Sequence, residues 1–180
     1  MQLAEQYDFI PSDIKEIEIG TGDWIYSRNC VPVEVRHHPK TGVDGQFSIP
    51  YLVCRALIDH KLDLSHITDE AVRRPEVLQL LQRVHSMIDP EIDKVAIPRT
   101  VQPARIRVTT KDGKIYEHRM DEPRGHTRNP MTPAEFIGKF HYCAGHAAKQ
   151  LPRENLEKGI QMINNLEQVD NVNEIWKFFT

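Results

Sequence analysis

Cysteine is scarce in this 180-residue chain, which has three, Cys30, Cys54 and Cys143, and no Cys-x-x-Cys pair. Their number and spacing argue against a disulfide framework and against a zinc site, and they fit a reducing compartment. Long blocks of one charge are also missing, since 23 Lys plus Arg are interspersed with 26 Asp plus Glu. The chain therefore lacks the basic footprint of a nucleic-acid-binding protein, and we expect no nucleic-acid partner.

We also expect neither a leader nor a membrane-spanning run. The opening stretch "MQLAEQYDFIPSD" has no basic region followed by an apolar one, and no apolar run approaches the length of a bilayer span. We therefore expect a cytoplasmic protein without a membrane partner. The apolar content of 39% is enough for a buried core. The length allows one domain or two small ones, and we expect a single domain over residues 1–180.

The first half of the chain predicts one strand and two helices. Alternating Ile and Glu predict a strand over residues 15–21, followed by a loop at 30–45 with an extended piece at "VEV". Ser48 is placed to cap a helix that starts at residue 49. Tyr51 and Arg55 share one face beside the expected buried stripe. That stripe consists of Leu52, Val53, Ala56 and Leu57. A second helical run covers "PEVLQLLQRV", residues 75–84.

The second half predicts a hairpin and further helices. After a proline-rich loop at 89–103, residues 104–120 form a hairpin whose three-residue loop ends at Gly113. Thr132-Pro133-Ala134-Glu135 is a capping box that starts a helix. Its buried stripe is expected to be Phe136, Ile137, Phe140, Cys143, Ala144 and Ala147. Helical segments follow at about 153–165 and in the last turn. The fold class is α+β, with a small antiparallel sheet and helices packed on one face.

No reaction centre is visible in the residue types alone. Nine histidines are present, but His141 and His146 diverge on a helix and His37 and His38 are adjacent, so we expect no metal site. Gly-x-Ser-x-Gly, P-loop and Gly-x-Gly-x-x-Gly motifs are absent, and Cys143 lies on an apolar stripe. The catalytic residues are therefore unknown at this point.

Three sequence blocks, in order, resemble the C-terminal part of the MmgE/PrpD family. The blocks are a Phe-Ser-x-x-Tyr helix start, a strand–Gly turn–strand, and a Gly-His-x-x-x-Pro loop before a helix with Lys-Phe. The matching residues are Phe47, Ser48 and Tyr51, then Asp112 and Gly113, then Gly125, His126, Pro130, Lys139 and Phe140. The resemblance runs from about Leu3 to about Leu166.

The resemblance implies the C-terminal lid of a two-domain carbon–oxygen lyase or isomerase, of the 2-methylcitrate dehydratase type known from propionate catabolism. Such an enzyme acts on a di- or tricarboxylic acid without metal or organic cofactor. It abstracts or delivers a proton beside a carboxylate and so eliminates water, loses carbon dioxide or epimerises a centre. The family's main catalytic groups come from a large helical domain and the crossover before the lid. The chain is therefore expected to be inactive without that domain, and to form a homo-oligomer that covers its apolar face.

The same resemblance gives three candidate substrate-binding residues, Tyr51, Ser48 and His126. Tyr51 matches a family tyrosine that faces the substrate, and it lies at a helix start, where an anion is favoured. The alternative is that Tyr51 packs on its neighbours, that Ser48 serves as a cap, and that His126 is solvated between Arg124 and Arg128. A second function class also stays open, a stand-alone binding module that keeps the lid fold without catalysis. Neither the acid nor the reaction type follows from the sequence.

Overall fold

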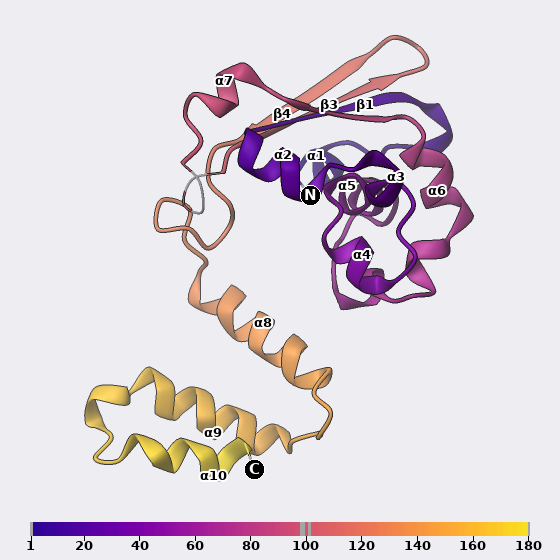
Figure 1. Ribbon diagram of the computed structural model, residues 1–180. Helices are drawn as coiled ribbons and strands as arrows, with labels where there is room; N and C mark the ends of the chain where they lie inside the picture. The colour runs from indigo at the N-terminus through magenta and orange to yellow at the C-terminus, as the bar shows by residue number, and fades with distance from the viewer. Residues whose placement is uncertain (1, 98–99, 101, 180) are drawn as a thin grey trace. The chain divides into compact units, whose positions relative to one another are not determined.

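The computed structural model describes residues 2–97, 100 and 102–179, and the chain divides into two compact units. Unit 1 is Met1–Pro123 and contains the sheet, whereas unit 2 is Arg124–Thr180 and is helical (Figure 1). The predicted α+β class is confirmed. The single domain over residues 1–180 stays a prediction.

The sheet of unit 1 has four strands in the order β2-β1-β3-β4. They are β1 (Ile14–Thr21), β2 (Val84–Ile88), β3 (Ala104–Thr110) and β4 (Ile115–Met120). The strand predicted at 15–21 is confirmed as β1. The expectation of a wholly antiparallel sheet is wrong in one pair: β2 pairs parallel to β1, while the other pairs are antiparallel, so the sheet is mixed. The helix predicted through residue 84 is wrong at its end, since it stops at Leu81 and Val84 begins β2.

The β3–β4 hairpin has the predicted register. Val108 lies opposite Tyr116 and Ile106 opposite His118, so like side chains face one another across the pair. Gly113 has a φ of 85° at the end of the loop, a left-handed conformation that glycine adopts without a steric penalty. The three-residue loop inferred from side-chain pairing is therefore confirmed.

Seven α-helices are described in unit 1. They are α1 (Gln2–Gln6), α2 (Asp23–Asn29), α3 (Val33–Arg36), α4 (Gly42–Gln46), α5 (Ile49–Asp59), α6 (Pro75–Leu81) and α7 (Pro90–Asp93). Single 3₁₀ turns lie at Pro11–Asp13, Leu64–Ile67 and Ala71–Arg73. The predicted loop at 30–45 is wrong in part, because "VEV" begins α3 instead of an extended piece. Thr41 and Asp44 then form a capping box that starts α4.

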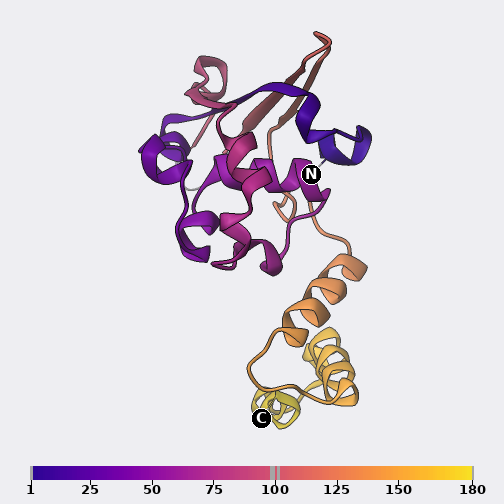
Figure 2. The same cartoon turned by 90° about the vertical axis from the view of Figure 1, so that its right-hand side faces the viewer.

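The core of unit 1 lies between one face of the sheet and the helices (Figures 1 and 2). Ile17 and Val108 from the strands pack with Leu57 of α5 and Val77 of α6, and each is at most 2% exposed. Burying such a side chain contributes about 1.5–3 kcal/mol. This layer fixes α5 against the sheet.

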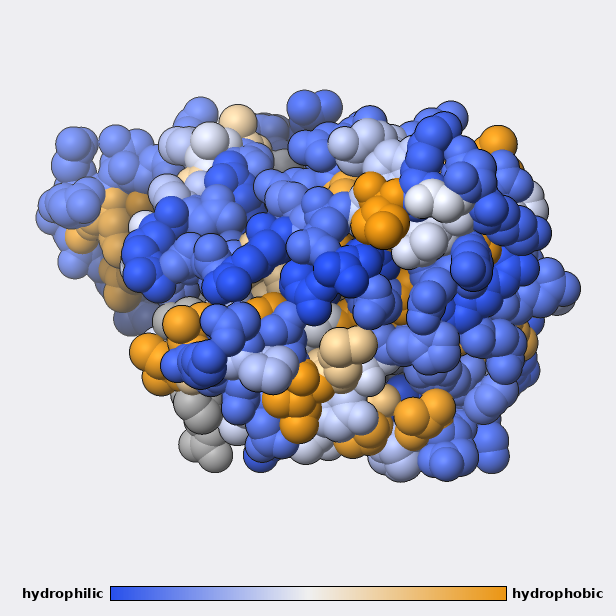
Figure 3. All heavy atoms as spheres, turned by 90° about the horizontal axis from the view of Figure 1, so that it is seen from above, coloured by the Kyte–Doolittle hydropathy of each residue, from blue (hydrophilic) through white to orange (hydrophobic). Residues whose placement is uncertain are grey.

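The opposite face of the sheet is polar. Arg107 Nε lies 2.7 Å from Glu117 Oε2, and Arg107 Nη1 lies 3.2 Å from Glu18 Oε2. The molecular face drawn in Figure 3 is mostly hydrophilic, with hydrophobic residues scattered over it. Helices therefore pack on one face of the sheet, as predicted.

Unit 2 contains α8 (Pro133–Gly145), α9 (Arg153–Asn164) and α10 (Trp176–Phe179), with 3₁₀ turns at Leu166–Gln168 and Val172–Ile175. The capping box of Thr132 and Glu135 is confirmed at the start of α8. The buried stripe predicted for α8 is wrong, because no residue of that helix is buried and Phe136 is 59% exposed. None of the helices in the described part of the chain has the length and apolarity needed to cross a membrane.

Candidate functional site

The loop-to-helix junction at Ser48 is held by hydrogen bonds on both sides. Ser48 Oγ accepts from the Tyr51 backbone N–H at 3.1 Å, as an N-cap should, and its own hydroxyl donates to the Arg36 carbonyl. Pro50 occupies the first turn, where no N–H is needed. The capping role predicted for Ser48 is confirmed, and the side chain is fully buried.

Tyr51 lies in the core and not beside it. Its side chain is 0% exposed, and its hydroxyl donates to the backbone carbonyl of His66. Its ring lies so close to Gly45 that a Cβ added to that glycine would be 3.0 Å from Tyr51 Cε1. Burial raises the pKa of the phenol. The expected place of Tyr51 next to the buried stripe is therefore wrong. Its role toward a substrate stays a prediction.

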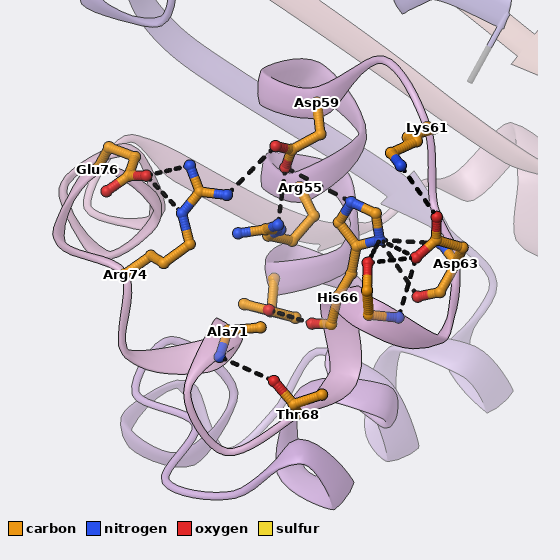
Figure 4. A network of polar contacts seen from close by, with 11 residues as sticks. Arg55, Asp59, Lys61, Asp63, His66, Thr68, Ala71, Arg74 and Glu76 are labelled. Carbon is orange, nitrogen blue, oxygen red and sulfur yellow. Dashed lines mark hydrogen bonds and ion pairs between the residues drawn. The ribbon is translucent and has the colours of Figure 1, made fainter. Parts of the chain in front are cut away.

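Tyr51 begins a row of polar side chains along one face of α5, with Arg55 and Asp59 one and two turns further on. Residues four apart lie on the same helix face, so this order follows directly from the spacing. Arg55 is 3% exposed, and its Nη2 lies 3.0 Å from Asp59 Oδ2. Figure 4 shows Arg55 and Asp59 within a wider cluster of polar side chains. We call that cluster the α5 polar network: Arg55, Asp59, Asp63, His66, Arg74 and Glu76.

Asp59 is the centre of this network. Its Oδ1 lies 3.3 Å from Arg74 Nη1, and its Oδ2 faces His66 Nε2 at 3.8 Å in addition to Arg55. Arg74 also pairs with Glu76, and that hydrogen bond raises the pKa of the guanidinium. Asp59 is therefore shared between two guanidinium groups, those of Arg55 and Arg74.

His66 comes from the 3₁₀ turn Leu64–Ile67 and is 2% exposed. Its Nδ1 lies 2.8 Å from Asp63 Oδ1 and 3.0 Å from the Asp63 backbone N–H, which donates to it. The Ser65 hydroxyl, followed by other donors nearby, lowers the pKa of Asp63. Asp63 and His66 therefore close the turn that brings the His66 carbonyl to Tyr51.

The arrangement leaves hydrogen-bonding capacity on Arg55. Its Nε and Nη1 are buried and have no hydrogen-bond partner among the described residues. Each of these two N–H groups is a charge-assisted donor of the kind that suits a carboxylate oxygen. No group of three or more His, Cys, Asp or Glu side chains converges in a metal-binding arrangement within residues 2–97, 100 and 102–179.

His126 belongs to unit 2, so it is described apart from Ser48 and Tyr51. Its Nδ1 accepts from the Arg128 backbone N–H at 3.2 Å, and its carbonyl accepts from the Asn129 N–H at 2.8 Å. The side chain is half-buried in this turn. Arg124 is not merely solvated, because it pairs with Glu135 and lowers the pKa of that carboxyl to about 2.

The comparison with known proteins decides which family this fold represents. The family model described as the MmgE/PrpD C-terminal domain matches residues 1–168, which include the α5 junction and the turn at His126. The chain belongs to the MmgE/PrpD family. The predicted resemblance is thereby confirmed, and the matched region includes residues from both units.

Similar proteins in animals and a fungus carry the name cis-aconitate decarboxylase. The human protein (Homo sapiens) is 27% identical over 174 residues, which cover 94% of this chain and 33% of the relative. The mouse protein (Mus musculus) is 27% identical over 142 residues, covering 76% of this chain and 27% of the relative. The protein of Aspergillus terreus is 24% identical over 139 residues, 76% of this chain and 28% of the relative. The matched part of the chain thus spans about a third or less of these relatives.

The sequence predicted the loop-to-helix junction at Ser48 but not most of the α5 polar network. The spacing of Tyr51, Arg55 and Asp59 at four-residue intervals was a readable signal, although it does not say that the face is buried. His66 and Arg74 reach the network through the chain's return after α5. No pattern of neighbouring residues in the sequence predicts that these side chains come together.

Proposed function

We propose that the chain is the C-terminal lid portion of an MmgE/PrpD-type enzyme that acts on a di- or tricarboxylic acid, and that turnover requires the family's helical domain. The observation that carries the proposal is the match to the family's C-terminal domain over residues 1–168, on a chain whose match spans about a third or less of its relatives. The relatives' name, cis-aconitate decarboxylase, makes an unsaturated tricarboxylic acid the first substrate to test.

The surface of unit 2 supports a missing helical partner. Among its described residues, Leu156 and Gly159 are buried, whereas Phe136, Val172 and Trp176 are 59%, 55% and 62% exposed. Three helical segments with so small a core leave apolar side chains in water. Apolar surface of this kind is usually covered by another protein surface. A helical domain would supply that surface, and without one we expect a homo-oligomer, most simply a two-fold dimer.

On the substrate side we retain Tyr51, Ser48 and His126 as proposed binding residues. The α5 polar network adds Arg55, whose unpartnered donors suit a carboxylate. Like Ser48, whose hydroxyl donates to the Arg36 carbonyl, Tyr51 already has a protein acceptor for its hydroxyl, the His66 carbonyl. A substrate role for this phenol therefore requires the carboxylate to replace that acceptor.

The proposal is tested by complex formation. The chain would be purified alone and together with the helical polypeptide encoded immediately upstream, in frame or as a neighbour, and the masses measured by light scattering. We expect a stable complex that Phe136→Ser weakens at least tenfold. Ile115→Ser is the matched control, because Ile115 is 62% exposed on β4 of unit 1. A chain that binds no helical polypeptide would favour the stand-alone binding module instead.

A further inference from the structure

Unit 1 contains an apolar pocket that the α5 polar network does not use. Its volume is about 290 Å³, and it lies between the inner face of the sheet and helices α1, α2 and α5. Most of its surface is apolar side chain. The main contributors are Leu3, Ile19, Val53, Leu57, Ile106 and Met120.

Two buried polar atoms in the pocket lining lack partners among the described residues. Thr21 is 1% exposed, and its Oγ1 makes no hydrogen bond. Gln102 Oε1 is likewise unpartnered, although the Nε2 of the same side chain donates to the Ile97 carbonyl at 2.8 Å. A buried hydroxyl or carbonyl left unpaired costs about 1–3 kcal/mol, so a ligand that satisfies both atoms gains that free energy.

The charge of the lining selects the kind of ligand. Arg105 is the one described lining residue with a permanent charge, and its guanidinium is occupied by Asp89 at 2.7 and 2.8 Å. His118 lines the pocket opposite Ile106 and has no partner among the described residues. An ionised head group would therefore be buried without a counterion, which is costly.

We propose that this pocket is a binding site for a small uncharged molecule with a ring-sized or short aliphatic body and one hydroxyl-type head. The head would donate to Gln102 Oε1 and accept from the Thr21 hydroxyl. A cavity of about 150 Å³ is enough for benzene, so 290 Å³ accommodates a ring with a substituent. This pocket is separate from the proposed binding residues for a di- or tricarboxylic acid, because its lining disfavours an ionised carboxylate.

The test uses the whole chain and three probes of one shape: benzyl alcohol, toluene and benzoate. Each would be titrated while the methyl NMR signals of Ile19 and Leu57 are followed. We expect saturable shifts with benzyl alcohol, affinity about fivefold weaker for toluene, and none for benzoate. Thr21→Val keeps the side-chain shape and leaves Gln102 in place, so it should lower the affinity for benzyl alcohol toward that of toluene and leave the affinity for toluene unchanged.

Two further variants keep the proposal falsifiable. Ala56→Leu should fill the pocket and abolish binding of both neutral probes, with folding checked by amide NMR spectra. If that variant does not fold, Gln102→Met removes the second polar atom and should again lower the preference for the alcohol. Any one of three results would overturn the proposal. These are the absence of a saturable shift, equal affinity for benzyl alcohol and toluene in both the Thr21 protein and the Thr21→Val variant, and NOEs that place the chain's own side chains inside the pocket.

Discussion

Removing the hydroxyl of Tyr51 gives the sharpest test of what this side chain does. Tyr51→Phe keeps the ring in a site that is 0% exposed, but it takes the donor away from the His66 carbonyl. The lost hydrogen bond contributes about 0.5–1.5 kcal/mol, and the carbonyl left in the interior raises the cost toward 3 kcal/mol. We therefore expect the free energy of unfolding of unit 1 to fall by about 1–3 kcal/mol.

The assay is urea unfolding followed by NMR signals of unit 1, so that unit 2 does not contribute. Tyr116→Phe is the matched control, because its ring packs on Phe9 and Tyr7 while its hydroxyl makes no hydrogen bond to the described residues. That variant should change stability by less than about 0.5 kcal/mol. If Tyr51→Phe is as harmless as the control, the hydrogen bond to His66 is not part of the folded state, and the phenol is available to a substrate.

Three substitutions and one pH titration test the junction and the helices α4 and α8. Ser48→Ala should cost about 1 kcal/mol of unfolding free energy through the lost cap, and an unchanged urea midpoint would contradict this. Gly45→Ala should cost about 1–3 kcal/mol, because the new Cβ would lie 2.7 Å from a Val72 methyl and 3.0 Å from the Tyr51 ring. Gly138→Ala meets nothing within 4 Å and should stabilise α8 by about 0.5–1 kcal/mol, so equal effects in calorimetry would refute the packing argument. The pKa of the Glu135 carboxyl is lowered to about 2. Its contribution to stability is therefore fully present above pH 4.5 and is lost as the pH falls through 2. A carboxyl ¹³C titration with a midpoint above about 4 would contradict this pKa.

The parts of the fold that the sequence predicted well are those coded by local chemistry. Side-chain pairing decided the hairpin register around Gly113, and the Thr132–Glu135 spacing located the start of α8. Each depends on residues a few positions apart. The Thr41–Asp44 box that starts α4 has the same kind of spacing and could have been predicted too.

The parts that were missed depend on distant contacts. β2 is five residues long, and Val84 is its one buried residue. It forms because β1 pairs with it in parallel, with Ile17 opposite Val84, and these two residues are 67 positions apart in the chain. A single strand without alternating burial has no periodic signal. Tyr51 was placed beside the core for a related reason: its face of α5 carries Arg55 and Asp59, and only the return of His66 and Arg74 buries it.

The central claim is that this chain needs a helical domain to act. Purified chain would be incubated with cis-aconitate, citrate and 2-methylcitrate, alone and with the helical polypeptide encoded upstream, and products followed by proton NMR. We expect no turnover by the chain alone and turnover of one of these acids by the complex. Turnover that stays with the isolated chain through every purification step would contradict it.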